Sequence, residues 1–85
     1  MSPEEFKKIL EAMPLRDIEV TVDGGRLRYI AVVTSPDYEG VSNYQRQHDV
    51  WMWMLEKIAS EHIPLVEFVF TWTPAEKAYY YRKQA

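Results

Sequence analysis

The chain has 85 residues and no cysteine, which excludes disulfides, thiolate nucleophiles and cysteine-ligated metal sites built by this chain alone. Hydrophobic residues make up 47% and charged residues 27%, so we expect one folded domain over residues 1–85, and the net charge of -3 argues against strong non-specific binding to nucleic acid. No apolar run approaches the roughly 20 residues that span a bilayer, and the acidic start is untypical of a secretory signal, so we expect a cytoplasmic protein without membrane contact.

The first predicted element is a helix over residues 2–13. Ser2 with Glu5 three residues later is typical of a capping box, Pro3 suits the first helical position, and Pro14 ends the helix. Its apolar residues follow helical spacing and predict one buried stripe: Phe6, Ile9, Leu10 and Met13.

A β-hairpin is predicted next, from strands at residues 18–22 and 27–34. The turn between them is Asp23-Gly24-Gly25-Arg26, a strong turn signal. Alternation in the second strand places these residues on one face: Leu27, Tyr29, Ala31 and Val33. The loop over residues 35–40 leads out of the hairpin.

A long helix follows, beginning at Ser42 with Gln45 as its capping partner and ending before Pro64. Steps of three and four predict an inward stripe made of Tyr44, His48, Trp51, Leu55, Ile58 and His62.

The last strand is predicted over residues 65–72, with these residues sharing a face: Val66, Phe68, Phe70 and Trp72. Thr73, Pro74 and Glu76 then begin a final helix. Because a helix connects the second and third strands, those strands are expected to be parallel. The predicted fold class is therefore α+β in the order αββαβα, a three-stranded mixed sheet with helices packed on one face.

The two histidines are the first candidate site residues. His48 and His62 are 14 residues apart, about 21 Å along one straight helix, which is too far for both to ligate one metal unless the helix breaks before His62, as Ser60 and Pro64 allow. His48 reads either as a helix histidine with a hydrogen-bond partner or as a site residue. His62 reads either as a cation at a helix C-terminus or as a ligand.

Trp53 is the second candidate, because it projects away from the predicted stripe among charged residues. Lys57 lies one turn away and is expected to stack on the ring, and Arg46 lies two turns back. An apolar ring on a charged helix face is typical of a contact hot spot, and self-association is one form of it. The alternative is that the first helix or the tyrosines of the tail cover Trp53.

Basic residues give the third candidate. Arg26 and Arg28 flank the hairpin turn, and the tail holds Lys77, Arg82 and Lys83 beside three tyrosines. Such residues either bind single-stranded nucleic acid by stacking and phosphate contact or form a solvated charged surface. The sequence holds neither a phosphate-binding glycine loop nor a constellation of catalytic residues, so we expect no enzymatic activity.

Several segments resemble the BolA family. They are Val22-Asp23-Gly24-Gly25, the run from Tyr29 through Ser35 to Glu39-Gly40, the triplet Arg46-Gln47-His48 with Trp51 and Leu55 behind it, and Thr73-Pro74 with Glu76. The resemblance extends from Phe6 to about Lys77. It implies a fold similar to class II KH domains, which is the order of elements predicted above.

The resemblance also implies a function. BolA-like proteins are non-enzymatic partners of monothiol glutaredoxins, with which they share a [2Fe–2S] cluster, and some are transcriptional regulators. The family's cluster-binding histidine opens the third strand, where Leu65 stands here, and His62 three residues earlier is the ligand expected by position. The resemblance therefore implies an adaptor or regulator that acts through protein contacts, with His62 toward the cluster. Together with the hot spot expected at Trp53, the residues expected toward partners are Arg46, His48, Trp53 and Lys57. A KH-like nucleic-acid-binding regulator using Arg26 and Arg28 and a self-associating scaffold are the alternatives.

Overall fold

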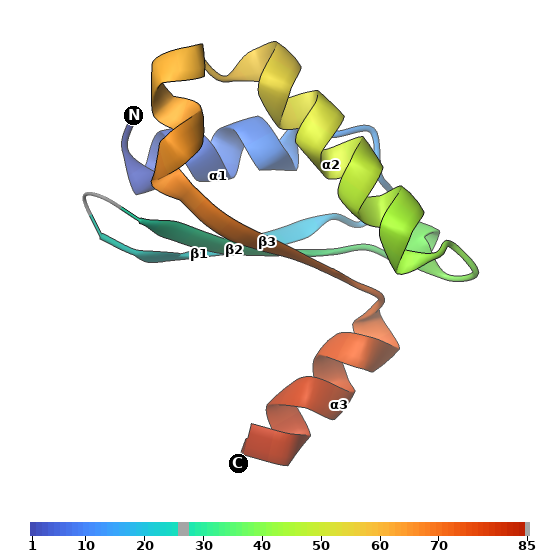
Figure 1. Ribbon diagram of the computed structural model, residues 1–85. Coiled ribbons are helices and arrows are strands. Elements are labelled where there is room, and N and C mark those ends of the chain that lie inside the picture. The colour runs from blue at the N-terminus through green and yellow to red at the C-terminus, as the bar shows by residue number, and fades with distance from the viewer. Residues whose placement is uncertain (26–27, 85) are drawn as a thin grey trace.

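A three-stranded sheet with two helices against one of its faces forms the body of the protein in the computed structural model, which describes residues 1–25 and 28–84 (Figure 1). Its helices and strands are α1 (Pro3–Glu11), β1 (Glu19–Gly24), β2 (Tyr29–Thr34), α2 (Asn43–Lys57), β3 (Val66–Trp72) and α3 (Pro74–Gln84). Two short 3-10 helices, η1 (Pro36–Tyr38) and η2 (Ser60–Leu65), lie on either side of α2. The predicted order αββαβα is confirmed.

Each α-helix begins at the predicted cap. The hydroxyls of Ser2, Ser42 and Thr73 each accept a backbone N–H from three residues further on, at 3.1 Å. The helix ends differ from the prediction, because α2 stops at Lys57 and its backbone turns extended at Ile58. The prediction that one helix continues to His62 is wrong.

The sheet has the predicted mixed topology. Strand β1 pairs antiparallel with β2, and β2 pairs in parallel with β3, as the helical crossover requires. The hairpin depends on Gly24, whose φ is 102° and where a Cβ would lie 2.1 Å from the Arg28 carbonyl oxygen. Arg26 and Leu27, for which a phosphate contact and a strand position were predicted, lie outside the described residues.

The core fills the space between the sheet and the layer of α1 and α2. Phe6 packs on Tyr29 with 5.5 Å between ring centroids, and the Tyr29 hydroxyl donates to the Met1 carbonyl at 2.6 Å. Other fully buried residues come from the helices and the inner face of the sheet: Leu10, Ala31, Val33, Val50, Met54 and Val69. Each large apolar side chain buried there stabilises the fold by about 1.5–3 kcal/mol, so this layer holds the body together.

The predicted inward stripe of α2 is wrong at Tyr44, His48 and Leu55, while Ile58 is buried and Trp51 packs against the core as predicted. Tyr44 is 80% and Leu55 58% exposed, whereas Val50 and Met54 are fully buried. The helix is turned so that the shorter Val50–Met54 row packs on β3. Arg46 joins that row, because its polar groups find acceptors beneath the helix.

Strand β3 contains a bulge that the alternation did not predict. Tyr29 lies opposite Val66 while Ile30 lies opposite Phe68, so one extra residue enters β3 at this point. The extra residue moves Val66 to the inner face, because a shift of one residue reverses the direction of a side chain. Phe68, Phe70 and Trp72 keep the predicted common face.

The third helix leaves the body on the side opposite α1 and α2 (Figure 1). Tyr80 of α3 stacks on Trp72 with 4.8 Å between ring centroids, and Lys77 pairs with Glu19 of β1 at 2.9 Å. The predicted packing on one face therefore holds for α1 and α2, and α3 lies beneath the opposite face. Across the part of the chain that the structure describes, no helix has the length and apolar character needed to cross a membrane.

Candidate functional site

Trp53 lies where α1 and α2 meet. Its indole Nε1 donates to the carbonyl oxygen of Ile9 at 2.8 Å, so α1 fixes the ring in place. The Nζ of Lys57 lies 4.9 Å from the ring centroid, which is the predicted cation–π contact. The ring is half-buried, so α1 covers part of it and solvent reaches the rest.

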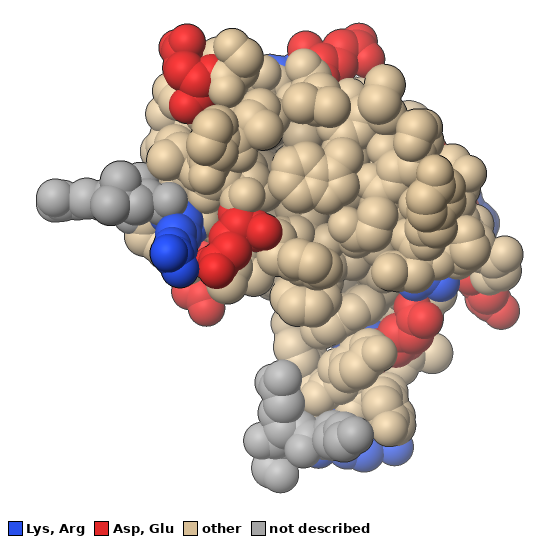
Figure 2. All heavy atoms as spheres, viewed as in Figure 1, with Lys and Arg blue, Asp and Glu red and all other residues tan. Residues whose placement is uncertain are grey.

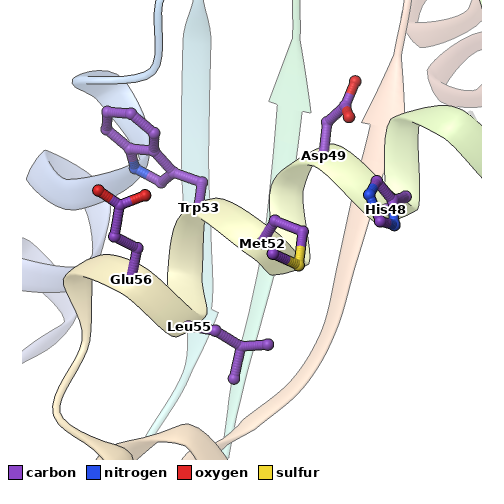
Figure 3. Close-up of a pocket in the computed structure, with 6 residues that line it drawn as sticks. All are labelled: His48, Asp49, Met52, Trp53, Leu55 and Glu56. Carbon is purple, nitrogen blue, oxygen red and sulfur yellow. The ribbon is translucent and has the colours of Figure 1, made fainter.

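Three neighbouring hollows surround this ring, and Figure 3 shows the residues of the largest. That hollow has a volume of about 540 Å³ and is lined by His48, Asp49, Met52, Trp53, Leu55 and Glu56. A second, of about 400 Å³, is lined by Lys8, Ile9, Ala12, Trp53 and Lys57. The third, of about 330 Å³, is lined by Met13, Pro14, Leu15, Tyr38, Asp49 and Trp53. We call these lining residues the Trp53 surface.

The Trp53 surface combines an apolar centre with a charged border. Met52 and Leu55 are 54% and 58% exposed and line the same hollow as Trp53, so together they form an exposed apolar patch. Acidic residues border the largest hollow, and Lys8 and Lys57 border the next one. Apolar centres surrounded by charge are typical of surfaces that bind other proteins.

Arg46 is a structural residue, which corrects its predicted role in partner binding. It is 7% exposed and donates to the carbonyl oxygens of Tyr38, Val41 and Thr71 at 2.8 to 3.0 Å. A fourth bond joins it to the Glu76 carboxylate at 2.7 Å. Its charge is satisfied inside the fold, so it offers little to a partner.

Tyr38, beside Arg46, shows how closed this region is. It is 4% exposed, and its burial raises the pKa of the hydroxyl to about 12. The carboxylate of Asp49 pushes the pKa of Tyr38 in the same direction, while the Arg46 guanidinium opposes both. The hydroxyl therefore stays protonated at neutral pH and does not serve as a base.

His48 is on the exposed side of α2 and lines the largest hollow, which corrects its predicted inward position. His62 lies in η2, where its backbone N–H donates to the Ala59 carbonyl at 2.8 Å, and its side chain is partly exposed. His48 lies in the first half of α2, and η2, which holds His62, follows beyond the C-terminal end of that helix, so the two histidines belong to different regions (Figure 1).

The residues present do not fit a cluster held by two ligands of this chain. The sequence has no cysteine, and the predicted ligand His62 is the only histidine near β3. Within residues 1–25 and 28–84, no three side chains of the His, Cys, Asp or Glu type come together to hold a metal ion. His62 alone remains as a donor.

Arg28 is the described member of the predicted nucleic-acid site. Its guanidinium is exposed and lies 3.5 Å from the carboxylate of Glu67 in β3. Lys77, from the basic tail, pairs with Glu19. Both cations thus face carboxylates of the same chain, which weakens any phosphate contact.

Gln47 is a residue that the sequence reasoning missed. Its side-chain amide donates to the carbonyl oxygen of Val69 at 2.8 Å, and Arg46 does the same for Thr71 at 3.0 Å. Both carbonyls point outward from the free edge of β3, so the two side chains close that edge. In the sequence, the role of Gln47 is indicated only by its place as a polar residue next to the buried residues of α2.

Comparison with known proteins supports the fold. No protein-family model matches the chain, and no curated protein matches it. Among solved structures, the crystal structure of a Bol-like protein from Babesia bovis is similar, with 21% sequence identity, 96% of this chain and 95% of that chain covered, and a TM-score of 0.60. At this identity the likeness speaks for the fold alone. The chain has the fold of a BolA-like protein, as the resemblance predicted.

Proposed function

We propose that this chain is a non-enzymatic adaptor of the BolA type that binds another protein through the Trp53 surface. The observation that carries the proposal is the position of Trp53, a half-buried ring held by Ile9 and Lys57 at the meeting point of three hollows. Rigid aromatic anchors of this kind contribute most of the binding energy at protein interfaces.

A monothiol glutaredoxin is the partner that we propose first, on the strength of the resemblance to BolA-like proteins. The donor set argues for a protein contact in which this chain supplies at most His62 to a shared [2Fe–2S] cluster. The exposed His48 and the Lys57 ammonium are then contact residues at the border of the Trp53 surface.

The proposal is tested by isothermal titration of the chain with a monothiol glutaredoxin. We expect saturable binding that Trp53→Ala abolishes and that Lys57→Glu weakens about tenfold, because a border charge of the wrong sign opposes docking. Tyr44→Ala is the matched control, since Tyr44 is on the same helix, is 80% exposed and lines none of the three hollows. Wild-type binding by both the Trp53 and Lys57 variants would refute the surface.

The role of His62 is tested separately, by absorption spectra after co-expression with the glutaredoxin. If His62 donates to the cluster, His62→Ala changes the visible spectrum while leaving the affinity within about twofold. An unchanged spectrum removes His62 from the cluster. Tight binding to a DNA oligonucleotide at low salt, where phosphate contacts are strongest, would favour the KH-like regulator instead.

A further inference from the structure

The face of the sheet opposite α1 and α2 carries a continuous row of aromatic rings, which we call the aromatic row: Phe68, Phe70, Trp72 and Tyr80. Successive ring centroids lie 4.6, 5.4 and 4.8 Å apart. Phe68 is 44%, Phe70 39% and Tyr80 43% exposed. Contiguous exposed apolar side chains on a small domain mark an interaction surface.

The surroundings of the aromatic row are electrically balanced. Arg28 is paired with Glu67, and Lys77 is paired with Glu19, so the cations at its two ends are matched by carboxylates. Figure 2 shows mostly residues other than Lys, Arg, Asp and Glu in the strip between the body and α3, with acidic and basic residues beside the start of the helix. Lys77 and Arg82 are the cations among the described side chains of α3, and because Lys77 is already paired with Glu19, they offer few of the several phosphate contacts that hold nucleic acid. The row therefore complements an uncharged occupant.

The shape of this side limits the occupant further. Helix α3 stands beneath the sheet (Figure 1), which obstructs a second sheet from stacking face to face. Addition of a strand to β3 is opposed as well, because the Val69 and Thr71 carbonyls already accept from Gln47 and Arg46. A narrow, extended chain that needs no edge pairing fits both conditions.

We propose that the aromatic row binds an uncharged, proline-rich segment of another protein in the polyproline II conformation. Such a segment has no internal hydrogen bonds and presents free carbonyl oxygens, and surfaces lined by tilted aromatic rings receive its proline rings. The rings of the row are tilted against one another by 24° to 51°.

Hydrogen-bond donors for those carbonyls are in place. Among the side chains of residues 1–25 and 28–82 and the described backbone, the Trp72 indole N–H and the hydroxyls of Tyr80 and Tyr81 have no hydrogen-bond acceptor. The Trp72 N–H is not a buried group without a partner, and Tyr80 and Tyr81 are 43% and 45% exposed, so these residues are open to solvent. A bound segment thus gains stacking from the rings and hydrogen bonds from the same residues.

Decaproline is the probe, titrated into the full chain by calorimetry, with a Gly-Ser decapeptide as the negative peptide. We expect saturable binding of decaproline alone. Phe70→Ser should abolish it, and Trp72→Phe, which keeps a ring and removes the N–H, should weaken it about tenfold. Tyr44→Ser, an exposed aromatic residue on α2, should bind as the wild type does.

This inference goes beyond the proposed function and uses the other side of the sheet, so Trp53→Ala should leave decaproline binding unchanged. Circular dichroism of each variant separates a lost fold from a lost contact. Absent binding of decaproline to the wild type, or wild-type affinity in both the Phe70 and Trp72 variants, overturns the proposal. A dimer, or an oligothymidine complex, that Phe70→Ser abolishes would also overturn it, since the row would then belong to that occupant.

Discussion

The guanidinium of Arg46 joins segments that are distant in the chain. From α2 it reaches the carbonyl of Tyr38 before the helix, that of Thr71 in β3 and the carboxylate of Glu76 in α3. A planar group with five donors suits such a junction, and no other side chain replaces it. The sequence marks Arg46 only as a charge, because its acceptors are backbone atoms that come together after folding.

Replacing Arg46 by Met is expected to lower the free energy of unfolding by about 2–4 kcal/mol, since buried carbonyls and the Glu76 carboxylate lose their donor. Urea denaturation followed by tryptophan fluorescence measures the change. Arg28→Met is the control, because that guanidinium is 77% exposed and its 3.5 Å ion pair contributes under about 1 kcal/mol. Equal losses in both variants would contradict the structural role of Arg46.

Asp37 gives the stability a dependence on acidic pH. Its carboxylate accepts the backbone N–H of Arg16 at 2.8 Å and the Arg16 Nε at 2.7 Å, and these bonds lower the pKa of Asp37 below its ordinary value of 3.8. A carboxyl whose pKa is lowered on folding stabilises the fold above pH 3.8. That contribution is lost as the pH falls through the lowered value.

Asp37→Asn is therefore expected to be less stable than the wild type at pH 7, with a difference that shrinks as the pH falls below 3.8. Unfolding free energies of both proteins, measured at unit steps from pH 7 to pH 2, follow this difference. The neighbouring substitution Asp17→Asn serves as the control. A gap between the wild type and Asp37→Asn that stays constant over the whole range would show that the ion pair does not stabilise the fold.

At the scale of elements, the sequence predicted where each helix begins better than it predicted which face of a helix or strand is buried. The hydroxyls of Ser2, Ser42 and Thr73 cap the helices as expected, because a cap depends on residues three positions apart. The buried face of α2 was mispredicted in part, because Val50 and Met54 are buried in a core that forms only when the helices pack on the sheet. The bulge in β3 was not predicted either, because the pairing with β2 decides the register of β3 and this pairing cannot be read from β3 alone.

Strand β3 is an edge strand whose outward carbonyls are covered by side chains of α2. Gln47→Leu leaves the Val69 carbonyl without its donor and is expected to cost about 1–2 kcal/mol of unfolding free energy. It should also raise self-association, because an open edge pairs with other chains. Light scattering over a concentration series checks this. Gln45→Leu is the control, because the Gln45 amide donates to Asp49 on the exposed side of α2. The molar mass of this variant in solution should equal that of the wild type.

At the scale of the molecule, the sheet separates two surfaces. The Trp53 surface lies in the layer of α1 and α2, and the aromatic row lies on the opposite face of the sheet, where α3 contributes Tyr80 to it (Figure 1). The composition indicates aromatic surfaces, since aromatic residues make up 14% of the chain. Only the fold shows that the two surfaces lie on opposite sides of the sheet. The candidate site could be predicted at Trp53 and Lys57, because one helical turn joins them, whereas its hollows depend on α1.

Two surfaces on opposite layers should behave independently. Within the part of the chain that the structure describes, Trp53 and Trp72 share no hydrogen-bond or ring partner. The unfolding free energies lost in Trp53→Ala and Trp72→Ala should therefore add within about 0.5 kcal/mol in the double variant. Urea denaturation of the four proteins of this cycle measures the sum. A coupling above about 1 kcal/mol would mean that the sheet transmits a change from one surface to the other, and partner binding at Trp53 would then depend on what occupies the aromatic row.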